Sequence, residues 1–185
     1  MPAPRAVGFI PYAAGSKGAF GAGLPFGRID ANALAKLAGL SERFGDGSLR
    51  TTPWRVLLIA NVAAADAKAV SEEVTALGLI ADPSDPRLRI FACVGKPACT
   101  SATVDARRDA TRLAAILGKD SGESVHVSAC AKSCAHRGPA PLTLVGRDGR
   151  YDLIRNGSAA DRPSLAGLSV DEIVALAGHA KEQAP

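Results

Sequence analysis

Residues 89–99 read RIFACVGKPAC and residues 125–134 read VHVSACAKSC, and these two stretches hold all four cysteines of the chain. The spacing is Cys-x5-Cys, a gap of 30 residues, and then Cys-x3-Cys. In each stretch, an apolar segment typical of a buried strand comes just before the cysteines. The end of a strand is a rigid place from which to present ligands. The sequence therefore predicts one metal centre held by two loops of a sheet.

The four predicted ligands are Cys93, Cys99, Cys130 and Cys134. Four thiolates are the usual ligand set of an iron–sulfur cluster, and we expect a [4Fe-4S] cluster. Structural zinc also accepts four cysteines, but about two to four residues usually separate its paired ligands, whereas five separate the first pair here. Two disulfides are the third alternative, and a reducing cytosol disfavours them.

The sequence around the cysteines is similar to that of a known superfamily. CVGKPAC is followed by HVSACAKSCAHRGPAPLTLVGRDGRYDLIRNG, in which a Val-Gly turn and a tyrosine-containing strand follow the second cysteine pair. This pattern resembles the [4Fe-4S] half-domain of the nitrite and sulfite reductase superfamily. The segments LPFGRIDA, TPWR and CAKSCAH are most similar to the precorrin-3B synthase family. The resemblance covers roughly residues 18–160 and only the second, C-terminal half of these two-part proteins.

The resemblance implies an oxidoreductase of cobalamin biosynthesis, a monooxygenase that converts precorrin-3A to precorrin-3B with oxygen while the cluster supplies electrons. One alternative is a sulfite or nitrite reductase component, in which Cys134 would also bridge to the iron of a sirohaem; no sirohaem is expected in the precorrin case. A non-catalytic iron–sulfur or zinc module is the other alternative. The implied partners are a polycarboxylate tetrapyrrole, an electron donor, and either the missing first half or a homodimer partner. Catalytic and substrate-binding residues stay unassigned, because many of them lie in the first half.

The order of the predicted elements indicates an α+β fold, in which a ferredoxin-like half-domain precedes the reductase-type [4Fe-4S] half-domain. The proline-punctuated turn DPSDPRLR separates the two. We expect a flexible lead-in rich in Gly, Pro and Ala over 1–23, the ferredoxin-like subdomain over 24–84, the cluster domain over 85–160, and a linker with an amphipathic helix over 161–185.

Residues 24–82 predict strand, helix, strand, helix, strand. LPFGRID is expected to be extended, ANALAKLAGLSERF to be a helix capped by Asp30, and WRVLLIANV to be a central strand. AADAKAVSEEVTALG is predicted as a second helix that Gly78 ends. The apolar face of this sheet is expected to be exposed unless another half or copy covers it.

In the cluster domain, the pattern predicts a helix from Thr100 or Ser101 to about Leu117, with its N-terminus toward the cysteine loop. A hairpin is expected to turn at Asp148-Gly149. The closing helix is expected to carry a capping box at its start.

Several further side chains each have a structural and a functional interpretation. Trp54 is expected to cap the core of its subdomain, and Arg55 is a candidate partner for a substrate carboxylate. Ala129 stands where the related families usually have glycine, which matters if the backbone there is left-handed. Three polar residues surround Cys134, and they either cap loop carbonyls or tune the cluster and meet an anion: Lys132, His136 and Arg137.

Composition narrows the functional classes. Aromatic residues make up 4% and the net charge is +4, without a long basic run, so nucleic-acid binding is not expected. The only apolar patch near the start, VGFI, is broken at Pro11, and no stretch is apolar for the roughly 18 residues of a membrane helix. We therefore expect a cytoplasmic protein. The sequence contains no recognisable Walker A, GxGxxG, HExxH or Ser-His-Asp pattern. The mildly positive net charge would suit binding of a polyanionic small molecule.

Overall fold

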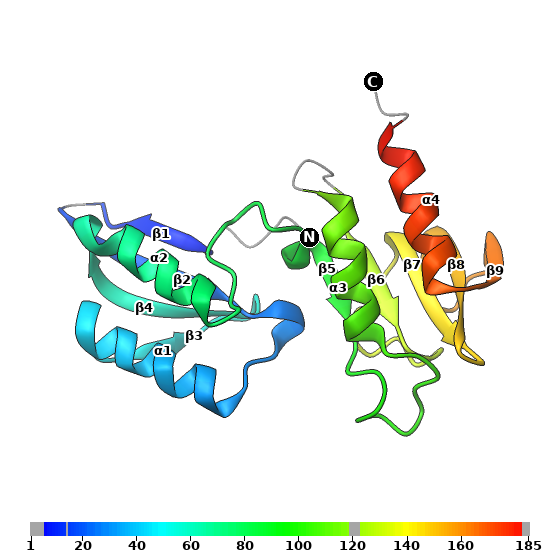
Figure 1. The fold of residues 1–185 in the computed structure, drawn as a ribbon, viewed down its shortest axis with the longest axis horizontal. Helices are drawn as coiled ribbons and strands as arrows, with labels where there is room; N and C mark the ends of the chain where they lie inside the picture. The colour runs from blue at the N-terminus through cyan, green and yellow to red at the C-terminus, as the bar shows by residue number, and fades with distance from the viewer. Residues whose placement is uncertain (1–5, 14, 119–122, 183–185) are drawn as a thin grey trace. The chain divides into compact units, whose positions relative to one another are not determined.

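The computed structural model describes residues 6–13, 15–118 and 123–182, and the chain divides into two units (Figure 1). Unit 1 is Met1–Leu88 and unit 2 is Arg89–Pro185. The division falls in the turn that was expected to separate two half-domains. Each unit combines a sheet with helices, which confirms the predicted α+β class. Among the helices in the described residues, none has the length and apolar character needed to cross a membrane.

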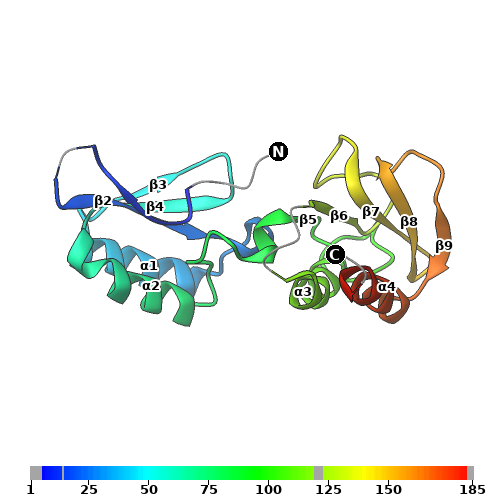
Figure 2. The same ribbon diagram turned by 90° about the horizontal axis from the view of Figure 1, so that it is seen from above.

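Unit 1 is a four-stranded antiparallel sheet with two helices on one face (Figure 2). The strands lie in the order β1-β2-β4-β3, with bounds Gly8–Pro11 (β1), Lys17–Gly23 (β2), Val56–Ala63 (β4) and Leu49–Thr51 (β3). The helices α1 (Ala31–Phe44) and α2 (Ala67–Ala76) contact each other and the central strands. Leu37, Ile59, Val70 and Val74 form the fully buried centre of this layer.

The predicted helices of unit 1 and their local signals are confirmed. The Asp30 side chain accepts a hydrogen bond from the backbone N–H of Ala33 at 2.8 Å, so it caps α1 as expected. Gly78 follows α2 with a φ of +74°, the left-handed conformation that commonly ends a helix. The segment WRVLLIANV contains β4, which lies between two other strands of the sheet.

The expectation of a flexible lead-in over 1–23 is wrong for most of that stretch. Residues 8–11 and 17–23 are β1 and β2, and Phe20 of β2 is completely buried. The glycines here permit close approach of backbones: a Cβ at Gly21 would lie 1.5 Å from the carbonyl oxygen of Ala6. Glycine in this segment therefore reflects tight packing and not chain freedom.

Two segments of unit 1 that were predicted to be strands do not form regular strands. The segment LPFGRID begins with a short 3₁₀ turn, Pro25–Gly27, in which Phe26 has a φ of +52°. The last predicted strand is reduced to a single bridge between Ile80 and Gly23. The physical reason is that β1 already pairs with most of the same edge of β2, which leaves room for only one residue pair.

The apolar face of this sheet is not left exposed. Val56 and Ala60 of β4 are each 1% exposed, and Val56 belongs to a small buried cluster that includes Ala6 and Val7. The expectation of an open patch considers β4 alone, whereas Ala6 and Val7, in the stretch expected to be a flexible lead-in, form a buried cluster with Val56.

Unit 2 is a five-stranded mixed sheet with two helices on one face (Figure 2). The strands lie in chain order with bounds Ile90–Ala92 (β5), Val125–Ser128 (β6), Ala140–Arg147 (β7), Arg150–Gly157 (β8) and Leu165–Leu168 (β9). The first three strands are parallel and the last three antiparallel. The helices α3 (Ala106–Leu117) and α4 (Val170–Glu182) contact each other.

The C-terminal part of unit 2 confirms two local predictions and corrects one. β7 and β8 form the expected hairpin, in which Asp148 and Gly149 both have positive φ, as a type I′ turn requires. The Ser169 hydroxyl and the Glu172 carboxylate cap each other's backbone N–H groups, the predicted capping box. Residues 161–185, however, are more than a linker and a helix, because β9 pairs with β8 and extends the sheet.

Candidate metal centre

The two cysteine loops leave the same edge of the sheet in unit 2. Cys93 follows β5 directly, and Cys130 lies two residues beyond β6. β5 and β6 are neighbouring parallel strands in which Ala92 pairs with Val127. Because parallel strands in register end side by side, the first and third cysteines begin their loops next to each other.

A direct hydrogen bond joins the two loops at this edge. The backbone N–H of Ala129 donates to the Cys93 sulfur at 3.1 Å, and the Cys93 N–H donates to the Val127 carbonyl at 3.2 Å. The left-handed backbone considered for Ala129 is not found; in this loop the positive φ belongs to Ser133. Alanine therefore replaces glycine here without backbone strain.

The structure does not gather all four sulfurs at one point. All four cysteines are free thiols; Cys134 is exposed and the other three are half-buried. In the described part of the chain, no three or more cysteine, histidine, aspartate or glutamate side chains are grouped closely enough to hold a metal ion. The donor set nevertheless suits a soft metal, because it consists of accessible sulfur ligands on two adjoining loops. Binding of one metal centre by all four cysteines would require their sulfurs to approach one another.

The first cysteine loop folds back on the start of α3. Gly95 has a φ of +67°, and a Cβ there would lie 2.6 Å from the backbone nitrogen of Ala106, so only glycine permits this approach. The backbone N–H of Lys96 donates to the carbonyl of Val104 at 2.9 Å, and the Lys96–Pro97 peptide is cis. The N-terminus of α3 therefore lies beside the cysteine loop, as expected.

The predicted start of that helix at Thr100 or Ser101 is wrong. α3 begins at Ala106, and the Asp105 side chain caps it by accepting from the Arg108 N–H at 3.2 Å. The residues between Cys99 and Asp105 instead form turns next to the cysteine loops. One example is the Ala102 N–H, which donates to the Cys99 carbonyl at 3.1 Å.

The polar residues expected around Cys134 have mainly structural contacts. Lys132 donates to the Ser101 hydroxyl at 2.8 Å, which links the second cysteine loop to the first. The His136 ring lies 3.3 Å from the Pro139 carbonyl through Nε2, and its centroid stacks 5.0 Å from that of Phe91. Arg137 is exposed. For His136 the loop-capping interpretation fits these contacts.

His126, on β6, is a buried polar residue that the sequence did not single out. Its side chain is completely buried, and neither ring nitrogen has a hydrogen-bond partner among the described residues. Its ring meets that of His136 edge to face, with centroids 5.8 Å apart. Burial, and secondarily the proximity of His136, lower the pKa of His126 to about 4, so the ring is neutral at physiological pH.

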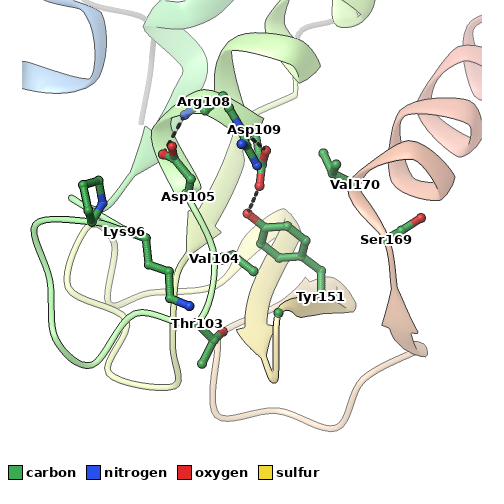
Figure 3. Close-up of a pocket in the computed structure, with 11 residues that line it drawn as sticks. Lys96, Thr103, Val104, Asp105, Arg108, Asp109, Tyr151, Ser169 and Val170 are labelled. Atoms are coloured by element: carbon green, nitrogen blue, oxygen red, sulfur yellow. Dashed lines mark hydrogen bonds and ion pairs between the residues drawn. The ribbon is translucent and has the colours of Figure 1, made fainter.

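A pocket of about 430 Å³ opens beside the first cysteine loop (Figure 3). It is lined by residues of the first cysteine loop and the segment after it, of the β7–β8 hairpin and of the starts of both helices, among them Lys96, Thr103, Asp109, Tyr151 and Ser169. The Tyr151 hydroxyl donates to Asp109 at 2.8 Å, and both side chains are buried. Burial and the Asp109 charge raise the pKa of Tyr151 strongly, which keeps the phenol protonated. The sequence signals for this pair were an acid beside the apolar Ala110 of α3 and the tyrosine-containing strand.

In unit 1, the structure assigns Arg55 a structural contact. Its guanidinium donates to the Leu88 carbonyl at 3.0 Å, and burial lowers its pKa. The Leu24 N–H donates to the Arg55 carbonyl at 2.8 Å, so the segments LPFGR and TPWR, distant in sequence, lie together. Trp54 is 48% exposed and does not cap the core.

Comparisons with known proteins place these features in a family context. The profile of the nitrite/sulfite reductase ferredoxin-like half domain matches residues 12–77. A precorrin-3B synthase from Sinorhizobium sp is 32% identical over 146 residues, which are 78% of this chain and 32% of that protein. The sulfite reductase [NADPH] hemoprotein beta-component of Nitrosomonas eutropha is 32% identical over 142 residues, which are 71% of this chain and 25% of that protein.

Solved structures agree with the fold. The Mycobacterium tuberculosis NirA protein superposes with a TM-score of 0.72 at 25% identity, over 91% of this chain and 35% of that chain. A dissimilatory sulfite reductase I, at 14% identity and a TM-score of 0.53, shares the fold alone. The chain thus spans about a third or less of the length of these proteins. It belongs to the nitrite and sulfite reductase superfamily of oxidoreductases, and within that superfamily it resembles precorrin-3B synthase.

Proposed function

We propose that this chain is the cluster-bearing part of an iron–sulfur redox enzyme, with one [4Fe-4S] cluster held by Cys93, Cys99, Cys130 and Cys134. The observation that carries the proposal is the placement of the two cysteine loops at the ends of neighbouring parallel strands, joined by the hydrogen bond from Ala129 to the Cys93 sulfur. Four free thiols on adjoining loops are the ligand set that such a cluster requires.

The proposed reaction is the oxygen-dependent conversion of precorrin-3A to precorrin-3B. Its support is the similarity to precorrin-3B synthase over 78% of the chain. When bound, the cluster would supply electrons to this reaction. The chain's own contribution is to hold the cluster at a rigid sheet edge, with the half-buried Cys93, Cys99 and Cys130 partly screened from water.

A sulfite or nitrite reductase component is the second candidate, and one observation favours it. Cys134 is the exposed ligand of the four, so its sulfur is open to a second cofactor such as the iron of a sirohaem. The similarity to sulfite reductase hemoprotein beta-components supports this alternative. A non-catalytic iron–sulfur or zinc module is the remaining alternative.

The proposed partners follow from the same reaction. They are a polycarboxylate tetrapyrrole, which suits the net charge of +4, an electron donor, and the remaining length of the enzyme or a second copy of this chain. The proposal also places the protein in the reducing cytoplasm, where four cysteines stay available as thiols.

Anaerobic purification followed by metal, sulfide and spectroscopic analysis tests the proposal. We expect iron and acid-labile sulfide, a broad brown absorbance, and a low-spin cluster signal by electron paramagnetic resonance after reduction. A sirohaem Soret band would favour the reductase alternative. Stoichiometric zinc without sulfide would contradict the cluster.

A further inference from the structure

Ala129, immediately before Cys130, makes hydrogen bonds in two directions. Its N–H donates to the Cys93 sulfur at 3.1 Å. Its carbonyl accepts two hydrogen bonds from Thr103, one from the backbone N–H at 3.0 Å and one from the hydroxyl at 3.2 Å. Ala129 is 1% exposed, so these bonds are shielded from water.

These contacts connect the loops that carry the cysteines. Thr103 lies four residues beyond Cys99, on the segment between the first cysteine loop and α3. Ala129 precedes Cys130 and therefore fixes the start of the second loop. Through Ala129, the sulfur of Cys93 and the backbone after Cys99 are both attached to the residue that positions Cys130.

β7 closes this arrangement from another side. A Cβ at Gly146 would lie 2.7 Å from the Ala129 carbonyl oxygen and 2.6 Å from the side chain of Val104. Such distances are too short for any other residue, so β7 packs directly on the Ala129 peptide. Ala129 is consequently held by the sheet as well as by the loop.

We propose that Cys93, Thr103, Ala129 and Gly146 form a clamp that joins the two cysteine loops before any metal binds, and that Thr103 is a positioning residue of the cluster site. The clamp fixes Cys93 and the approach to Cys130, while the exposed Cys134 lies beyond it. Its purpose rests on the proposed cluster, but its existence is a property of the metal-free chain. A preorganised pair of ligands reduces the loop ordering that cluster binding would otherwise require.

The test is amide hydrogen exchange of the full chain, reduced and freed of metal by a chelator. We expect the Ala129 N–H to be protected in the wild-type chain. Thr103→Val keeps the branched shape and removes the hydroxyl, and it should accelerate exchange of the Ala129 N–H about fivefold. Thr111→Val is the matched control, because the Thr111 hydroxyl bonds the Arg107 carbonyl within α3, and it should leave that rate unchanged.

A second pair of variants tests the sulfur acceptor. Cys93→Ala removes the acceptor of the Ala129 N–H and should accelerate its exchange, whereas Cys99→Ala in the same loop should not. An unprotected Ala129 N–H in the wild-type chain, or equal rates in Thr103→Val and Thr111→Val, would overturn the clamp.

The clamp and the proposed function can fail separately. Protection of the Ala129 N–H in a chain that takes up no iron or sulfide on anaerobic reconstitution would support the clamp and contradict the proposed cluster. Normal cluster uptake by a chain whose Ala129 N–H is unprotected when metal-free would contradict the clamp and support the proposed cluster.

Discussion

At the scale of single residues, His126 is the side chain whose environment has the clearest consequence. It is buried with both ring nitrogens unpaired among the described residues, and its pKa is lowered to about 4. In the unfolded chain the same ring has a pKa near 6.5. The neutral ring is therefore favoured in the folded state, and its contribution to stability is present above about pH 6.5 and is lost as the pH falls towards 4.

We predict that the free energy of unfolding decreases by up to about 1.4 kcal/mol for each pH unit between pH 6.5 and 4 on account of His126. His136 is the titratable neighbour in ring contact, and it strengthens this effect when charged. His126→Phe keeps an aromatic ring and removes the titration, so urea titrations across this range should show a flatter slope for the variant. Parallel slopes for the two proteins would contradict the prediction.

The buried Tyr151–Asp109 pair gives a second prediction at this scale. Tyr151→Phe leaves the buried Asp109 carboxylate without its phenol donor, although Arg108 still pairs with it. We expect a loss of about 1–3 kcal/mol in the free energy of unfolding, measured by urea titration. Tyr12→Phe is the control, because the Tyr12 hydroxyl is at an exposed site. Its expected loss is below about 0.5 kcal/mol.

At the scale of elements, signals that act within a few residues of the chain were readable from the sequence. The cap at Asp30, the capping box at Ser169 and the hairpin turn at Asp148-Gly149 each depend on local hydrogen bonds or local φ values. The long apolar run of β4 was also readable, because a strand that is buried on both faces is continuously apolar. The prediction that the four cysteines are metal ligands rests on their residue type and spacing alone and stays a prediction.

Elements that depend on distant partners could not be read in this way. β1 is only four residues long and β2 is rich in glycine and alanine, and they become strands through the pairing of β1 with β2 and of β2 with β4. β9 exists because β8 offers it an edge. Likewise, the contacts of Ala129 with Cys93 and Thr103 depend on the register of β5 and β6, which no local pattern encodes.

A pair of glycine substitutions tests this distinction. Gly21→Ala in β2 would place a Cβ 1.5 Å from the Ala6 carbonyl, so the backbones must separate, and we expect a loss of more than about 2 kcal/mol in stability. Gly39→Ala lies within α1 and meets nothing within 4 Å. It should instead stabilise the chain by about 0.5–1 kcal/mol. Thermal or urea unfolding measures both, and equal effects would contradict the packing role of Gly21.

At the scale of the whole molecule, the chain spans about a third of the precorrin-3B synthase that it resembles. An exposed sheet face in unit 1 does not support a missing partner, because Ala6 and Val7 belong to a cluster that covers Val56 of β4. The support for a missing partner comes from the residues of the candidate site instead. The described residues provide the cysteine loops, whereas Arg55, the candidate for binding a substrate carboxylate, is engaged with the Leu88 carbonyl.

We therefore predict that this chain, loaded with its cluster, accepts electrons but does not convert precorrin-3A unaided. Turnover should appear only when the remaining length of the enzyme is supplied, on the same polypeptide or on a partner, because this chain matches only 32% of the precorrin-3B synthase. The measurement combines an anaerobic reduction assay, an oxygen-dependent turnover assay, and light scattering to determine the oligomeric state. Cys134→Ser is the control for cluster-dependent electron uptake, which it should abolish. A monomer of this chain that produces precorrin-3B alone would show that one half holds the complete active site.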